Sequence, residues 1–143
     1  MDHGPQLPLF DQWPDGRVKL YTLAKALRLR RSYPDLFHSG EYEPLTGDED
    51  PHLIGFSRRH GNDEVIVLVP RFIATMLRGV PRAPLGMERW RTASVRLPRR
   101  LATARLTNLF TGDTIEPVVH RGVPWLLAGS AFQSWPVAIL QVR

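Results

Sequence analysis

The hydrophobic pattern of this chain changes once, from the helical repeat of 3.6 residues to the strand repeat of 2, near residue 41. Residues 16–33 carry an apolar stripe at helical spacing, whereas the later residues form short alternating runs separated by turns. Short strands spaced by 8 to 12 residues are typical of an antiparallel sandwich. The sequence therefore predicts an α+β fold that is mostly β. One N-terminal amphipathic helix packs on an antiparallel β-sandwich of about seven or eight strands.

The predicted helix has two apolar sides. Leu20, Leu23 and Leu27 form a broad stripe, while Val18 and Leu29 lie about 20° apart on the opposite side. We expect Asp15 to be the N-cap, because Asp is a preferred residue there. We expect Tyr33-Pro34 to end the helix, because a residue before proline avoids the α region. A helix with two apolar sides contacts two surfaces. We expect one to be the core of this domain, and Val18 and Leu29 to form a docking face for something outside this chain.

The remaining elements are predicted from alternation and turn residues. A hairpin is expected at residues 60–63, and residues 64–69 are apolar on both faces, which indicates a central strand. A long loop at residues 71–91 has room for one or two helical turns at 72–77, and loops of this length are usually functional or docked. The expected strands are 41–45, 52–59, 64–69, 92–97, 104–110, 114–119, 123–127 and 136–142.

Charge is unevenly distributed along the chain. Residues 1–70 hold 8 basic and 11 acidic groups, net −3, and residues 71–143 hold 11 basic and 3 acidic groups, net +8. A basic half raises the possibility of a nucleic-acid partner. The arginines are scattered, however, and no aromatic-rich strand alternates with them as a base-stacking platform requires. We therefore expect a solvated surface or one that meets an acidic partner, with no specific nucleic acid bound.

Composition excludes several classes of protein and of site. The 143 residues contain no cysteine, which removes disulfides and thiolate chemistry and fits a reducing, cytoplasmic location. No run of eighteen apolar residues exists, so no membrane partner is expected, and the first sixteen residues lack the pattern of a signal peptide.

Candidate chemistry is sparse. The five histidines have no metal-ligand spacing, and no nucleophile or phosphate-binding motif occurs, so we expect no catalytic residue, metal or cofactor. The acidic run at residues 48–50 is expected to be a solvated turn. Trp125 is predicted to lie in the core, and Trp135, which precedes Pro136, is predicted to close one end of the sandwich. Trp13 and Trp90 lie in irregular segments and are the candidates for stacking on a sugar ring.

Several motifs, in a fixed order, resemble one enzyme family. They are DGRVKLY at 15–21, ALRLRR at 26–31, PDLF at 34–37, GEY at 40–42, GFSRR at 55–59, VLVPR at 67–71 and WPVAIL at 135–140. This pattern, over about residues 13–143, is similar to the C-terminal end of the maltooligosyltrehalose synthases, which belong to the α-amylase family. LFTG at 109–112 also resembles a hairpin of the C-terminal domains of amylases.

The resemblance implies a division of the chain and a role for it. Residues 1–15 would be a tail or linker, 16–40 the helix equivalent to the end of a catalytic barrel, and 41–143 an amylase-type C-terminal β-sandwich. The intact enzyme would be an isomerase of trehalose biosynthesis, a (1→4)-α-D-glucan 1-α-D-glucosylmutase that needs no cofactor. Its catalytic carboxylates lie in the barrel, so we expect this chain alone to be inactive.

The resemblance also suggests what the chain contacts. We expect the partner to be the catalytic barrel of the same enzyme or a self-association partner, with only weak affinity for maltooligosaccharides. The alternative is a free-standing carbohydrate-binding or interaction module.

Overall fold

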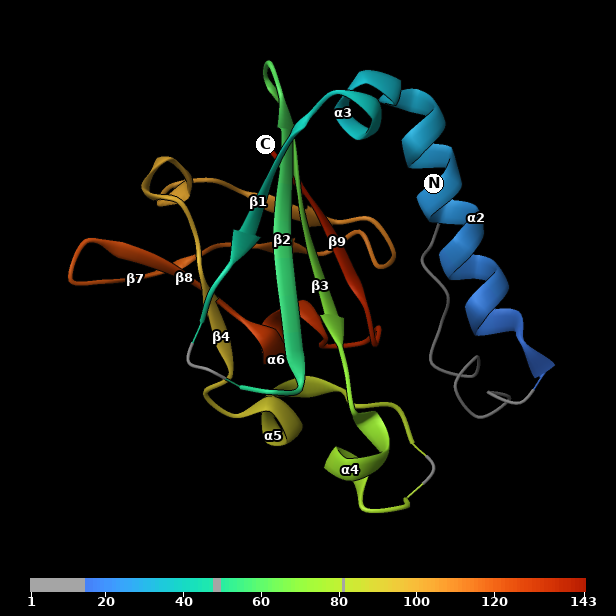
Figure 1. Ribbon diagram of the computed structural model, residues 1–143. Helices are drawn as coiled ribbons and strands as arrows, with labels where there is room; N and C mark the ends of the chain where they lie inside the picture. The colour runs from blue at the N-terminus through green and yellow to red at the C-terminus, as the bar shows by residue number, and fades with distance from the viewer. Residues whose placement is uncertain (1–14, 48–49, 81) are drawn as a thin grey trace.

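Two antiparallel sheets form the body of the molecule in the computed structural model, which describes residues 15–47, 50–80 and 82–143 (Figure 1). The larger sheet has the strand order β1-β2-β3-β9-β5-β6 and the smaller one β4-β8-β7. The strands of the described residues are β1 (Glu41–Leu45), β2 (Leu53–His60), β3 (Asp63–Pro70), β4 (Ser94–Arg96), β5 (Leu106–Asn108), β6 (Thr114–Ile115), β7 (Val118–His120), β8 (Val123–Leu127) and β9 (Ala138–Val142). The predicted α+β class, mostly β, is confirmed.

The hairpin of β2 and β3 is the longest paired unit of the large sheet. Its register runs from Leu53 opposite Pro70 to His60 opposite Asp63, so only Gly61 and Asn62 lie in the turn, as the sequence predicts. Strand β3 also pairs with β9 and is therefore an interior strand. Pro44 lies in the edge strand β1, where the absence of its backbone N–H costs no ladder hydrogen bond.

The main core lies between the two sheets. Alternation points Ile66 and Leu68 of β3 inward, where they join Leu140 of β9 and Leu126 of β8. Helices α5 (Gly86–Trp90) and α6 (Ala128–Ala131) contribute Trp90 and Ala128 to the same cluster, and Phe132 follows α6. Burial of these apolar side chains is the dominant favourable contribution to folding.

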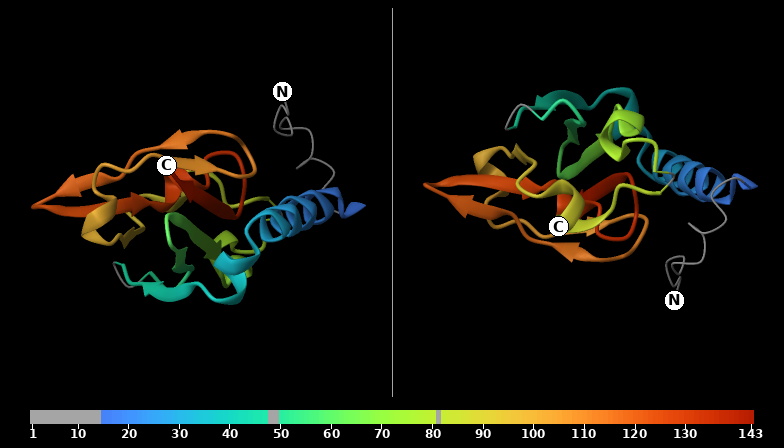
Figure 2. Two further views of the ribbon diagram at one scale, coloured as in Figure 1. Left: turned by 90° about the horizontal axis from the view of Figure 1, so that it is seen from above. Right: turned by 90° about the horizontal axis from the view of Figure 1, so that it is seen from below.

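Two further helices cover part of the outer face of the large sheet. Helix α2 (Arg17–Ser32) runs along one side of the sandwich, and the short α3 (Pro34–His38) follows it before β1 (Figures 1 and 2). Val65 of β3 faces outward and is buried beneath Leu29 and Leu36 from these two helices. Strand β3 is thus covered on both faces at this point, which explains why its sequence is apolar on both.

Local backbone geometry refines the predicted helix boundaries. The N-cap is Gly16, with φ of 80°, rather than the predicted Asp15. Asp15 still accepts a hydrogen bond from the backbone N–H of Arg17 at 2.9 Å, which lowers the pKa of its carboxyl. Tyr33 is the C-cap of α2, as predicted. Pro34 follows it and occupies the first turn of α3, where its missing N–H costs no helical hydrogen bond.

Segments 71–91 and 114–119 also differ from the sequence analysis. The predicted helical turn in the long loop is α4 (Ile73–Leu77), whereas α5 was not predicted. The single strand predicted at 114–119 is two strands in different sheets, β6 and β7. They are separated by residues 116 and 117, and Pro117 cannot donate to a sheet ladder. The described residues therefore contain nine strands rather than seven or eight.

Candidate functional site

The tryptophan predicted to stack on sugar is buried. Trp90 is only 2% exposed, and its Nε1–H donates to the carbonyl of Pro84 at 2.8 Å. Its ring centroid lies 4.9 Å from that of Phe132, inside the main core. The prediction for Trp90 is wrong because contacts distant in sequence cover the ring. Trp13, the other candidate, lies outside the described residues.

Val18 and Leu29, the predicted docking face, are buried as well. Val18 packs with Phe110 and Trp135, and Leu29 packs with Leu36 and Val65. They are 7% and 5% exposed, so this side of α2 is occupied by the sandwich of the same chain. The sequence identifies the two apolar sides correctly and assigns them to the wrong partners.

Hydrogen bonds donated by two aromatic side chains fix which side of α2 packs on the sandwich. The hydroxyl of Tyr21 donates to the carbonyl of Phe110 at 2.8 Å, and Nε1–H of Trp135 donates to Oγ1 of Thr22 at 3.1 Å. The rings of Tyr21 and Trp135 meet edge to face with centroids 5.0 Å apart. These contacts are satisfied only when the Val18 side of the helix faces the sandwich.

The opposite side of α2 is exposed. Leu20, Leu23 and Leu27 are 67%, 51% and 52% exposed. The helix that carries them contains six basic residues and no acidic one. Exposed apolar side chains gathered on one surface mark a site of interaction more often than isolated ones do. These three residues, which we call the leucine stripe, are the strongest functional candidate in the described residues.

A second apolar surface lies on the outer face of the large sheet, beyond the helices. Tyr42 of β1 and Ile54 of β2 are exposed there, and the half-buried Phe56 packs against Tyr42 with ring centroids 5.1 Å apart. The register places these residues on the same face as Val67, which is also half-buried.

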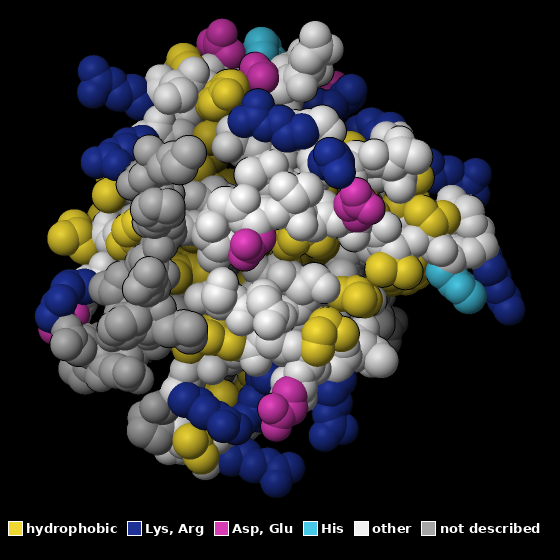
Figure 3. Space-filling model, turned by 180° about the vertical axis from the view of Figure 1, so that it is seen from behind, with side chains coloured by type: hydrophobic (Ala, Val, Ile, Leu, Met, Phe, Trp, Pro, Cys, Tyr) yellow, Lys and Arg dark blue, Asp and Glu magenta, His cyan; other side chains and the backbone are white. Residues whose placement is uncertain are grey.

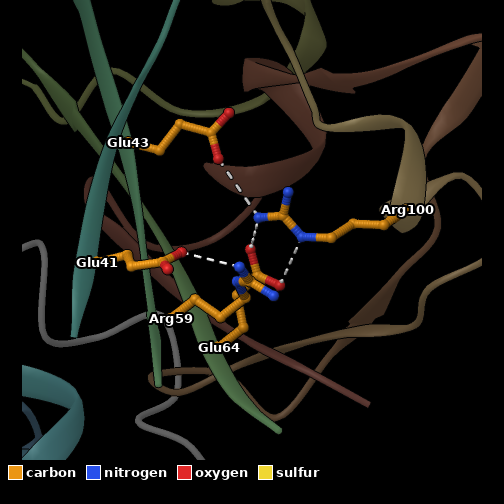
Figure 4. Close-up of polar contacts among 5 residues, drawn as sticks. All are labelled: Glu41, Glu43, Arg59, Glu64 and Arg100. Atoms are coloured by element: carbon orange, nitrogen blue, oxygen red, sulfur yellow. Dashed lines mark hydrogen bonds and ion pairs between the residues drawn. The ribbon is translucent and has the colours of Figure 1, made fainter. Parts of the chain in front are cut away.

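A network of ion pairs joins β1, β2, β3 and the 3₁₀ turn η2 (Arg99–Leu101) (Figure 4). Arg100 Nη2 donates to Oε1 of the buried Glu64 at 2.7 Å and, at 3.4 Å, to Oε2 of Glu43. Arg59 pairs with Glu41 at 2.8 Å. The hydrogen bond to Glu64 raises the pKa of Arg100, and the hydrogen bond from Arg59 lowers the pKa of Glu41.

This network is suited to stability rather than to acid–base catalysis. Each of its three carboxylates accepts at least one hydrogen bond from an arginine, so none of them is open to a substrate on all sides. A retaining glycosidase site instead needs two carboxyl groups about 5 Å apart on either side of a sugar, one of them a proton donor. No group of three or more His, Asp or Glu side chains in the described residues is arranged to hold a metal ion.

Basic side chains are spread rather than gathered. On the face opposite that of Figure 1, Lys and Arg lie mainly around the margin of the molecule (Figure 3). One hollow of about 260 Å³ beside α5 is lined by Arg82, Arg89 and Arg91, with Glu88 among them. Glu88 is the one carboxyl group among its described lining residues, so the hollow lacks the pair that glycoside chemistry needs. No helix in the described part of the chain is long and apolar enough to cross a membrane.

Comparison with curated proteins gives a local match to one enzyme name. Two strains of Mycobacterium tuberculosis have a "putative maltooligosyl trehalose synthase" that is 39% identical to this chain over 56 residues. The match covers 38% of this chain and 7% of either relative, so the chain spans a small part of the proteins that it matches. No protein-family model and no solved structure matches the chain.

Proposed function

We propose that this chain is a C-terminal β region of a maltooligosyltrehalose synthase, where it supports the part of the enzyme that carries the catalytic groups. The observation that carries the proposal is the local identity to a much longer protein of that name. The ordered motifs from residue 15 to residue 140 support the same assignment, and so does a helix that is seated on the sandwich by one side only.

The proposed enzyme rearranges the terminal α-1,4 bond of a maltooligosaccharide to the α,α-1,1 bond of trehalose within one molecule. Such a retaining transfer requires a nucleophile and a general acid in a cleft that excludes water. Glu41, Glu43 and Glu64 serve as ion-pair partners of Arg59 and Arg100 instead. The role left to this chain is therefore to hold the catalytic part, through the outward side of α2.

The gene neighbourhood tests this proposal first. We expect the source genome to encode a (β/α)₈ barrel of the same enzyme immediately upstream, in frame or as an adjacent gene. A genome without any such barrel would contradict the proposal.

Activity of the purified chain tests the proposed division of labour. Incubation with maltopentaose is expected to give no maltotriosyltrehalose, measured by chromatography of the products, because the neighbouring carboxyl groups of Glu43 and Glu64 hold Arg100 between them rather than a sugar. Turnover that a point substitution in this chain abolishes would show that the chain itself is catalytic.

A free-standing carbohydrate-binding module is the alternative. Its strongest support is the exposure of two aromatic rings, Tyr42 and Phe72, at 59% and 60%. They lie toward opposite ends of β2, since Tyr42 is paired with Arg58 and Phe72 follows the end of β3 that pairs with Leu53. Separated rings do not make one stacking platform, so we expect millimolar or weaker binding of maltopentaose, roughly −4 kcal/mol. Low-micromolar binding in a calorimetric titration would favour the module.

A further inference from the structure

The leucine stripe has the geometry of a helix-packing seam. Leu20, Leu23 and Leu27 follow the spacing i, i+3, i+7 and lie within about 60° of one another around α2. They extend about 10 Å along the axis, which is two turns. This spacing is that of the apolar positions of a heptad, where each side chain inserts between residues of a facing helix. The geometry thus favours a helix as the occupant.

Every charged residue on the flanks of the stripe is basic. Lys19 and Arg30 lie on one flank and Arg28 and Arg31 on the other, and all four are exposed. None of these four side chains belongs to an ion pair within the described residues. Charges at such flanking positions determine which partner a helix accepts. A partner that buries the stripe must therefore supply acidic groups.

A second copy of the chain does not meet this requirement. A symmetric pairing of two stripes places basic flank against basic flank, and like charges at a helix interface are repulsive. An anionic membrane meets the charge requirement but not the shape, because interfacial helices bury a broader apolar face that commonly includes Trp or Phe. The exposed apolar side of α2 consists of three leucines within about 60° of the helix circumference and holds no Trp or Phe.

We propose that the leucine stripe and its basic flanks are a docking face for an amphipathic protein helix whose apolar seam is bordered by Asp and Glu. The contact is small, below the size of a stable free-standing interface, so its affinity in isolation is expected to be micromolar. Under the proposed function the acidic helix belongs to the catalytic part of the enzyme, where a covalent connection would strengthen the contact. The docking chemistry itself does not depend on that function.

Two synthetic helical peptides provide the probe. Both carry the same leucine seam, but one has Glu and the other Lys at every flanking position. We expect the full chain to bind the Glu peptide with micromolar Kd in fluorescence anisotropy and to show no binding of the Lys peptide. Raising NaCl from 0.05 to 0.5 M, about a threefold fall in Debye length, is expected to weaken binding at least tenfold.

Matched variants separate specific docking from non-specific hydrophobic binding. Leu23→Asp is expected to abolish binding of the Glu peptide, while Val119→Asp is expected to leave it unchanged. Val119 is 51% exposed, as Leu23 is, but lies on β7 in the smaller sheet. The double variant Lys19→Glu/Arg30→Glu is expected to reduce binding of the Glu peptide and to create binding of the Lys peptide. Circular dichroism confirms that each variant is folded, since all four positions are exposed.

Four results would overturn the proposal. The first is failure of the chain to bind the Glu peptide. The second is an equal loss of affinity for that peptide in Leu23→Asp and in Val119→Asp. The third is a dimer in sedimentation equilibrium that Leu23→Asp abolishes, which would indicate a second copy. The fourth is binding to phosphatidylserine vesicles that Leu23→Asp abolishes, which would indicate a membrane surface. No maltooligosaccharide or catalytic domain enters these assays, so their failure is distinct from a failure of the proposed function.

Discussion

The core between the two sheets and the contact beneath helix α2 are built differently. The main core is one continuous cluster of apolar side chains, several of them fully buried, such as Ile66, Leu140 and Phe132. The contact beneath α2 consists of two small clusters, and hydrogen bonds of Tyr21 and Thr22 supplement them. The core therefore determines the fold, whereas the smaller contact determines which side of one helix remains available.

The largest expected effect is in the main core. Phe132 is fully buried and its ring packs on Trp90, so Phe132→Ala is expected to cost about 3–5 kcal/mol of unfolding free energy. Urea unfolding monitored by tryptophan fluorescence measures the loss. A cost below that of Leu29→Ala would contradict the distinction between the two regions.

The next prediction compares the two sides of α2. Leu29→Ala is expected to cost about 2–3 kcal/mol, because Leu29 is buried against Leu36 and Val65. Leu27→Ala, two residues away on the exposed side, is expected to change the unfolding free energy by less than about 0.5 kcal/mol. Both substitutions place the same residue in the same helix, so helix propensity affects them equally.

Urea unfolding of the isolated chain measures both variants. Equal and large losses would mean that Leu27 is also covered, and the leucine stripe would no longer be available for docking. Equal and small losses would mean that α2 contributes little to the stability of the sandwich.

The smallest expected effect is in the ion-pair network. Arg100→Met leaves the carboxylate of Glu64, whose side chain is only 6% exposed, without its main partner. The expected cost is about 1–2 kcal/mol, reduced from that of a fully buried pair because the side chain of Arg100 is 39% exposed. Arg59→Met is the matched control, since it removes the exposed pair with Glu41, and we expect a smaller loss than that of Arg100→Met at pH 7.

The pH dependence of this control follows from the lowered pKa of Glu41. A carboxyl whose pKa is lower in the folded state contributes stability above its unfolded pKa and loses it as pH falls through the folded value. Any difference between Arg59→Met and the parent chain is therefore expected to vanish at acidic pH. Thermal unfolding at several pH values measures it, and a difference that grew on acidification would contradict the assignment.

Much of the fold follows from local sequence. The boundaries of β1 and β8 agree with the predicted residues, and the turn between β2 and β3 was placed correctly, because alternation and turn residues are local signals. The division of residues 114–119 between two sheets was missed, although Pro117 is a signal against one continuous strand. Helices α5 and α6 are short and each contains a glycine, Gly86 or Gly129, which is a poor helix former and hides the signal.

The candidate site was harder to predict, for a physical reason. Counting apolar residues favours the leucine stripe as the side that packs on the domain, since it is broader than the side of Val18 and Leu29. Which side of α2 packs on the sandwich depends instead on Tyr21 and Thr22. Tyr21 is hydrogen-bonded to Phe110, and Thr22 is hydrogen-bonded to Trp135. Those partners lie 89 and 113 residues further along the chain. No local period contains that information.

The position of β9 has a consequence for how the protein is made. This strand lies between β3 and β5, so before residues 138–142 are available the large sheet exists only as β1-β2-β3 and β5-β6, with nothing to join them. A nascent chain that has formed every earlier strand still has an incomplete large sheet, and the apolar edge of β3 is open to pairing with other chains. We therefore expect assembly of the sandwich to wait until residues 138–142 have left the ribosome, and helix α2 to lack its seat on Trp135 and Ile139 until the same moment.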